Sequence, residues 1–232
     1  MGRLAIQIGY LGMALVAATF SSCNKEPITS WDSPRMLAAK QEWDSLRKNP
    51  PKEVGPGSSK NDKLIEMQQD LLRKTLSGGD MRRLAATCGT LPTDEKNPNA
   101  FEVNVLPYMV AAFIEAGDRE GLVTLLSNRF VEYIGPELST ARYLLRCPKR
   151  ALKDPILVLG EAYSRSKAPE VRLQIAQVVR RGFDGDGIAA KDDAEFVANA
   201  MQWYQMNKSH LTPRDPARFG KSFFEDDRTP AK

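Results

Sequence analysis

Apolar residues recur at helical spacing from about residue 62 onward, after a stretch rich in proline and glycine. Leu64, Met67, Leu71 and Leu76 form the first stripe. It predicts a helix that ends at Gly78-Gly79, followed by a shorter helix over residues 81–88. No alternation of apolar and polar residues competes with this pattern, so the sequence predicts helices rather than strands.

Further apolar stripes follow, separated by glycine and proline. They consist of Leu106, Val110, Phe113 and Ile114, then Leu122, Leu126, Phe130 and Ile134, then Leu138, Ala141, Leu144 and Leu145. Pro107 is expected in the first turn of the first of these helices, and Gly117 should close that helix in the left-handed conformation. Asp118 should cap the second helix, and Pro136 and Pro148 should end the second and third.

The most regular pattern is a pair of helices over residues 154–183. Asp154 is expected to cap the first helix, and a short turn separates it from the second, which starts at Pro169. The second helix carries the stripe Val171, Ile175, Val178 and Val179.

The start of that second helix carries a family resemblance. Pro169 opens the run Pro-Glu-Val-Arg after an apolar helix and a tight turn, and this arrangement resembles a HEAT repeat. The resemblance implies that Val171 is buried and that Arg172 stands where the family's arginine reaches an acidic residue of the turn. Ser166 or Lys167 occupies that acidic position in this chain.

The helices together define the expected fold class. A capping box from Asp192 to Glu195 predicts a last helix carrying Phe196, Val197, Ala200, Met201 and Tyr204. Antiparallel helix pairs with an apolar stripe on every member must stack to bury those stripes. The sequence therefore predicts an all-α domain over residues 60–207, either a short HEAT-like α-solenoid of stacked antiparallel pairs or a compact irregular helical bundle. Residues 208–232 are expected to form a polar C-terminal tail, anchored by Phe219, Phe223 and Phe224.

The first 22 residues have the layout of a bacterial export signal. They contain one charged residue, Arg3, followed by an apolar run from residue 4 to residue 20. The sequence Phe20-Ser21-Ser22-Cys23 resembles a lipobox, which implies removal of residues 1–22 and attachment of lipid to Cys23. A retained anchor helix and an ordinary secreted protein are the alternatives. Asn24 follows the cysteine where inner-membrane lipoproteins carry Asp, so the resemblance implies delivery to the outer membrane.

Residues 23–59 are expected to act as a tether. Prolines, glycines and serines leave little room for regular structure there, apart from one short helix. Ser33 should cap that helix and Pro34 should occupy its first position. Its apolar side would carry Met36, Leu37, Trp43 and Leu46. The helix is expected to dock on the domain, with contact to the bilayer surface as the alternative.

Composition and net charge exclude some classes of protein and disfavour others. The chain has 232 residues, of which 42% are hydrophobic and 27% charged, so neither a multi-span membrane protein nor a disordered chain fits. The formal net charge is +4, and Arg3 is the one charge lost with the signal segment. Nucleic-acid binding therefore has little support.

No motif for catalysis is present. Hydrolase, zinc-protease, nucleotide-binding and dinucleotide-binding signatures are all missing, and the single histidine, His210, cannot be matched with a nucleophile by spacing. We expect no catalytic residue and no cofactor. Of the cysteines, Cys88 and Cys147 are expected to be separate buried thiols rather than a disulfide, since they lie in helices separated by two others.

Two weaker candidate sites remain. The first resembles part of an EF-hand loop and would bind calcium through Asp184, Asp186, Asp192 and Asp193. The alternative is an interhelical turn rich in Asp and Gly, which needs no metal. The second is a basic patch for acidic partners or lipid headgroups, against the alternative of a solvated face. Its members are Arg142, Arg146, Lys149, Arg150 and Lys153.

These observations favour a lipid-anchored cell-envelope protein that acts as a protein–protein interaction scaffold. Its partners would be the membrane, through the N-terminal lipid, and an envelope protein that the sequence does not identify. The alternatives are a ligand- or calcium-binding envelope protein, and an enzyme or a non-catalytic subunit of an enzyme complex.

Overall fold

The computed structural model describes residues 27–51, 59–91, 101–131, 133–135, 138–145, 152, 154, 156–183, 187–214 and 222–228. The helices in these ranges are α1 (Pro34–Lys48), α2 (Lys60–Thr75), α3 (Gly78–Thr87), α4 (Phe101–Ala116), α5 (Arg119–Asn128), α6 (Thr140–Leu145), α7 (Leu157–Arg165), α8 (Pro169–Gly182) and α9 (Asp193–Asn207). Short 3-10 turns, η1 (Cys88–Thr90) and η3 (Lys208–His210), follow α3 and α9. The protein is mostly helical, which confirms the predicted all-α class.

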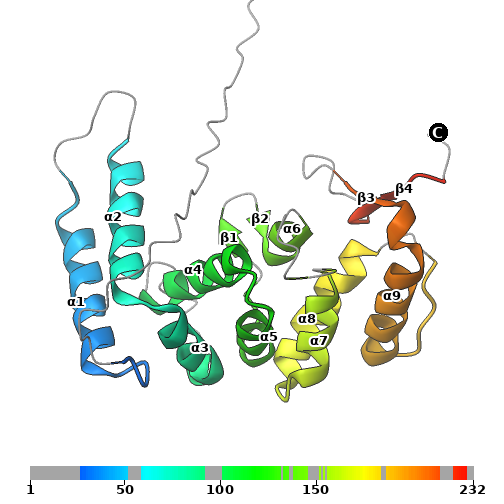
Figure 1. The fold of residues 1–232 in the computed structure, drawn as a ribbon, viewed down its shortest axis with the longest axis horizontal. Coiled ribbons are helices and arrows are strands. Elements are labelled where there is room, and N and C mark those ends of the chain that lie inside the picture. Colours follow the sequence, from blue (N-terminus) through cyan, green and yellow to red (C-terminus); the bar gives the residue numbers. More distant parts are fainter. Residues whose placement is uncertain are drawn as a thin grey trace, which may run out of the picture.

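The helices form a row along the long axis of the molecule, from α1 and α2 at one end to α9 at the other (Figure 1). Helices α3, α5 and α7 pack side by side, α4 packs on α5, and α8 packs on α7 and α9. One continuous hydrophobic core runs through the row. The array therefore exposes a long surface while burying a stripe of nearly every helix.

Two small antiparallel hairpins interrupt the helical pattern. Strand β1 (Tyr133–Gly135) pairs with β2 (Leu138–Ser139), and β3 (Leu211–Pro213) pairs with β4 (Phe224–Asp226). The expectation that no strands occur is wrong at these places, because segments this short leave no alternating pattern to read.

Side-chain caps fix several helix starts. Ser59 with Asp62, and Ser77 with Asp80, form reciprocal capping boxes at α2 and α3. The prediction that Gly78-Gly79 ends the preceding helix is wrong: that helix ends at Thr75, and the glycines open α3 behind the cap from Ser77. A satisfied capping box outweighs the poor helix propensity of glycine in a first turn.

Helices α4 and α5 differ from the prediction at their ends. Helix α4 begins at Phe101, so Pro107 lies inside it rather than in its first turn. Burial of Phe101 and Val105 extends the helix upstream of the proline. Gly117 adopts φ 68° as expected, and Asp118 caps α5 through the Gly121 N–H.

Helix α5 stops earlier than its apolar stripe suggests. It ends at Asn128, and the chain then turns into β1, although Phe130 is still buried. Helix α7 likewise starts at Leu157 instead of at a cap by Asp154. Asp154 has φ 53°, its carbonyl accepts the Leu157 N–H, and its carboxylate accepts a hydrogen bond from Lys208.

The described part of the expected tether, residues 27–51, is packed on the folded body, which confirms the expectation that its helix docks on the domain. Ile28, Met36 and Trp43 belong to the core, and α1 packs on α2 and α4. The ring of Trp43 meets that of Phe101 edge-on at 5.6 Å. The prediction that Leu37 belongs to the apolar side of this helix is wrong, because the residue is 47% exposed. Burial against distant helices, which composition does not encode, orders this segment.

The C-terminal strap, defined as residues 211–214 and 222–228, closes the far end of the row. Phe223 and Phe224 are buried among Phe183, Trp203 and Tyr204. The Phe223 N–H donates to the Gly182 carbonyl at 2.5 Å. A Cβ atom on Gly182 would lie 1.9 Å from the Phe223 ring, so this contact requires glycine. Phe219, the third expected anchor, lies outside the described residues.

Candidate functional site

A groove of about 550 Å³ lies between α7, α8 and α9 near the C-terminal end of the row. Its buried and half-buried lining includes Leu157, Gly160, Val197 and Met201, and its more polar side includes Arg119, Glu161, Tyr163, Arg172 and Gln205. Its size is in the range that accommodates a small molecule or a few residues of peptide.

Gly160 sets how closely α7 and α9 approach at the base of the groove. A Cβ atom at this position would lie 2.6 Å from Cγ of Met201. The carbonyl of Gly160 also accepts a hydrogen bond from Oγ of Ser164 at 2.9 Å. Glycine here lets Met201 fill the space that any larger residue would occupy.

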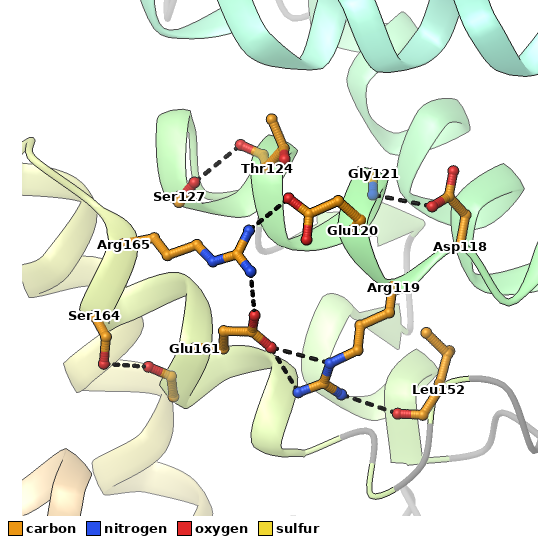
Figure 2. Close-up of polar contacts among 11 residues, drawn as sticks. Asp118, Arg119, Glu120, Gly121, Thr124, Ser127, Leu152, Glu161, Ser164 and Arg165 are labelled. Atoms are coloured by element: carbon orange, nitrogen blue, oxygen red, sulfur yellow. Dashed lines mark hydrogen bonds and ion pairs between the residues drawn. The ribbon is translucent and has the colours of Figure 1, made fainter.

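A chain of charged groups fixes the α5 side of the groove, as Figure 2 shows. Arg119, the first residue of α5, donates from Nε and Nη2 to Oε2 of Glu161 at 3.0 and 2.7 Å. Its Nη1 donates to the carbonyl of Leu152 at 3.0 Å. Arg165 joins the other oxygen of Glu161 to Glu120, at 2.5 and 2.6 Å. The side chain of Glu161 is therefore held from both sides by guanidinium groups.

The outer pair of this chain shows mutual pKa shifts. The hydrogen bond from Arg165 lowers the pKa of Glu120, and the hydrogen bond to Glu120 raises the pKa of Arg165. Glu120 therefore stays ionised well below neutral pH, and Arg165 stays protonated well above it. Because the pair is largely exposed, it orients α5 and α7 more than it stabilises them.

Arg172 differs from the other two arginines. Its side chain is exposed at the groove, and it has neither a hydrogen bond nor an ion pair with any residue that the structure describes. The turn before α8 is closed instead by Ser166, whose Oγ accepts the Ala168 N–H at 3.3 Å. Arg172 thus places at the edge of the groove a positive charge that no acidic side chain of the described residues pairs.

The other residues of the HEAT resemblance lie where the sequence predicts. Pro169 is the first residue of α8, and Val171 is buried, together with the rest of the stripe on that helix. Arg172 is the fourth residue of α8, close to the turn between the helices, where Ser166 or Lys167 replaces the acidic residue of the family.

The calcium candidates are divided between described and undescribed residues. Asp184 and Asp186 lie outside the described residues. Asp192 caps α9 by accepting the Glu195 N–H, and Asp193 pairs with Arg180 at 2.8 Å. The capping box predicted from Asp192 to Glu195 is not reciprocal, because the Glu195 carboxylate accepts the Lys191 N–H and not that of Asp192. In the part of the chain that the structure describes, no three acidic, histidine or cysteine residues gather in a way that could hold a metal ion.

Cys23 and the basic patch cannot be placed. Cys23, Arg146, Lys149, Arg150 and Lys153 lie outside the described residues. Arg142 belongs to α6, and only its backbone is described. Both assignments stay predictions.

The sequence did not reveal most of the groove. Glu161 and Arg165 are an i,i+4 pair that a helix model of α7 could have indicated. The contact of Arg119 with Glu161 spans 42 positions, and the approach of Met201 to Gly160 joins helices separated by α8. Only tertiary packing brings these residues together.

A second hollow lies between the start of α3 and the turn from α4 to α5. It is lined by residues such as Gly78, Gly79 and Gly117 and has a volume of about 490 Å³. Arg82 donates to Asp118 there at 2.6 Å, and Asp118 also caps α5. Because these charges satisfy each other, this hollow is a weaker binding candidate than the groove.

Comparison with known proteins finds no matching family, no matching curated protein and no matching solved structure. None of the helices in the described ranges is long and apolar enough to cross a membrane. The function must therefore be argued from the chain's own residues.

Proposed function

We propose that this protein is a lipid-anchored envelope protein whose HEAT-like solenoid binds an acidic segment of another protein in the groove between α7, α8 and α9. In this proposal the chain is exported and held on the periplasmic side through Cys23, and Asn24 favours the outer membrane. The role is one of binding rather than catalysis.

The unpaired charge of Arg172 is the observation that carries the proposal. Arg119 and Arg165 are engaged by Glu161 and Glu120, so they cannot turn toward a ligand without losing those contacts. Arg172 has no such engagement within the described residues. A carboxylate arriving at the groove would gain a charge-assisted hydrogen bond without displacing an internal one.

The walls of the groove support an extended peptide as the ligand. Ala194 and Ala198 present small exposed side chains of α9, and Leu157, Val197 and Met201 supply apolar surface beside Arg172. Apolar lining with a few placed polar groups is typical of sites that bind by burial and orient by charge. A short segment with an acidic residue next to apolar ones matches both features.

Fluorescence anisotropy with defined peptides tests this function. The probes are a dye-labelled peptide that alternates Glu with Leu and a peptide of the same length with Gln in place of Glu. The wild-type protein should bind the Glu peptide more tightly, and Arg172→Glu should weaken that binding about tenfold or more. Lys74→Glu, which reverses an exposed charge on α2 at the other end of the row, is the matched control and should change little. Equal affinity of wild type and Arg172→Glu for the Glu peptide would contradict the proposal.

A further inference from the structure

The chain is fastened to the folded body only a few residues after Cys23. Ile28 is 0% exposed, and its N–H donates to Oδ1 of Asp80 at 2.9 Å. The indole N–H of Trp31 donates to the carbonyl of Leu84 at 3.2 Å. Arg35 donates to the carbonyl of Thr75 and lies 3.4 Å from Oδ2 of Asp80. These contacts define an N-terminal clamp, residues 28–35 held on the start of α3.

The carboxylate of Asp80 is the main acceptor that holds this clamp. It is buried, and it also accepts the N–H and the hydroxyl of Ser77 at 3.1 and 2.7 Å. Burial raises the pKa of Asp80, but the hydrogen bonds from Ser77 and Ile28 and the charge of Arg35 outweigh that effect, so the pKa lies below its usual value. The carboxylate is thus ionised, and the clamp closed, throughout the neutral range.

Covalent geometry then limits the length of the anchor. Five residue steps separate Cys23 from Ile28, and a fully extended chain covers at most about 3.6 Å per residue. The α-carbon of Cys23 therefore cannot lie more than about 18 Å from that of Ile28. A flexible spacer of the expected length, reaching to residue 59, would allow several times that distance.

We propose that the lipid anchor holds the α1–α3 end of the row at the membrane surface, because only five residue steps join Cys23 to Ile28 in the N-terminal clamp. This inference rests on the proposed lipidation of Cys23. The groove is lined by residues of α7, α8 and α9. These helices lie toward the opposite end of the row from α1 (Figure 1), so the anchored end and the binding end are separate.

Energy transfer from tryptophan to dansyl-labelled lipid reports how close the α1–α3 end lies to the membrane surface. The lipidated mature chain, carrying Trp203→Phe so that the donors are Trp31 and Trp43, is placed in vesicles of phosphatidylethanolamine and phosphatidylglycerol. A second chain carries twenty Gly and Ser residues inserted between Lys25 and Glu26, which adds an r.m.s. reach of about 25 Å. The transfer efficiency should fall at least about twofold on insertion, since the donors can then leave the surface.

Ile28→Asp provides an independent release of the clamp. It should lower the transfer efficiency less than the insertion does, because Trp31 stays within eight residues of Cys23 after the clamp opens. Circular dichroism should show that the helices remain. Transfer that is the same with and without the insertion would overturn the short anchor.

Coupling the mature chain to maleimide lipid through Cys23, with Cys147→Ser, repeats the comparison without cellular lipidation. If the cell adds no lipid, the anchor of the proposed function fails, and so does the native placement of this end at the membrane. A loss of transfer on insertion in the coupled chains would then still show that the short link from residue 23 keeps the α1–α3 end near the lipid.

Discussion

The backbone N–H of Ile28 and the carboxylate of Asp80 form a hydrogen bond of 2.9 Å across 52 positions of sequence. This contact ties the segment before α1 to the start of α3. Both partners are buried, so the bond cannot be exchanged for one to water without opening the structure.

Asp80→Asn should therefore destabilise the protein by about 1–3 kcal/mol, because it removes a buried charge that Arg35 and Arg83 approach and weakens the acceptor of Ile28. Urea unfolding followed by circular dichroism measures the change. Asp70→Asn is the matched control, since Asp70 forms an exposed i,i+3 pair with Arg73 and should cost about 0.5 kcal/mol or less.

The same residue gives the stability an acid dependence. A carboxyl group whose pKa is lowered by folding contributes stability above its unfolded pKa, here 3.8, and loses it as the pH falls through the folded pKa. The stability of the wild type should hold from pH 7 to pH 5 and then decline below about pH 4. Asp80→Asn should decline less steeply over the same range. An identical decline in both proteins would remove Asp80 as a source of acid sensitivity.

Two neighbouring residues of α8 should respond very differently to the same substitution. Val171 is 5% exposed and Leu173 is 49% exposed. Val171→Asp places an unpaired charge between α7 and α8 and should destabilise by several kcal/mol, whereas Leu173→Asp should change the stability by about 0.5 kcal/mol. Thermal unfolding compares them, and a Val171→Asp midpoint within a degree of the parent would show that the pair is not packed as described.

Gly182→Ala should release the C-terminal strap. The added methyl group would overlap the ring of Phe223, which cannot move away without leaving the aromatic cluster. The strap should become sensitive to protease, and the emission of Trp203 should shift to longer wavelength as water reaches it. Gly78→Ala is the control, because no atom lies within 4 Å of its added Cβ. A strap as resistant as that of the parent would contradict this packing.

Cys88 should be inert in the native protein. Its thiol is fully buried, and burial raises its pKa to about 12. A thiol reagent at pH 8 should leave it unlabelled until denaturant is added, after which it should react without prior reduction. Because the unfolded thiol ionises near pH 9, the stability should also fall between pH 9 and pH 12. If Cys88 stays unreactive after denaturation without reductant, it is paired, and the expectation of separate thiols at Cys88 and Cys147 is wrong.

Local sequence patterns predicted the parts of the fold that local patterns control. The stripe on α8 is buried as predicted, and the caps at Asp118 and Asp192 are in place. The all-α class follows from such stripes alone. The predictions fail where contacts between residues distant in sequence determine the structure. Ile28, whose burial depends on α3, is one example, and the start of α3 at Gly78-Gly79 is another.

The candidate site was predictable only in part. The resemblance at residues 169–172 singled out Arg172, and the missing acid in the turn was visible in the sequence. The pairing of Arg119 with Glu161, which makes Arg172 the unpaired arginine of the three, depends on how α5 packs on α7. No periodicity within either helix encodes that contact.

Attachment to the membrane through Cys23 is the central claim of the proposed function. Intact-mass spectrometry of the protein extracted from the membranes of an expressing bacterium tests it most directly, with Cys23→Ser as the control. We predict a chain that begins at Cys23 and carries the added mass of diacylglycerol, and a Cys23→Ser chain without lipid. A wild-type chain that retains residues 1–22, or that is cleaved but carries no lipid, would contradict the claim.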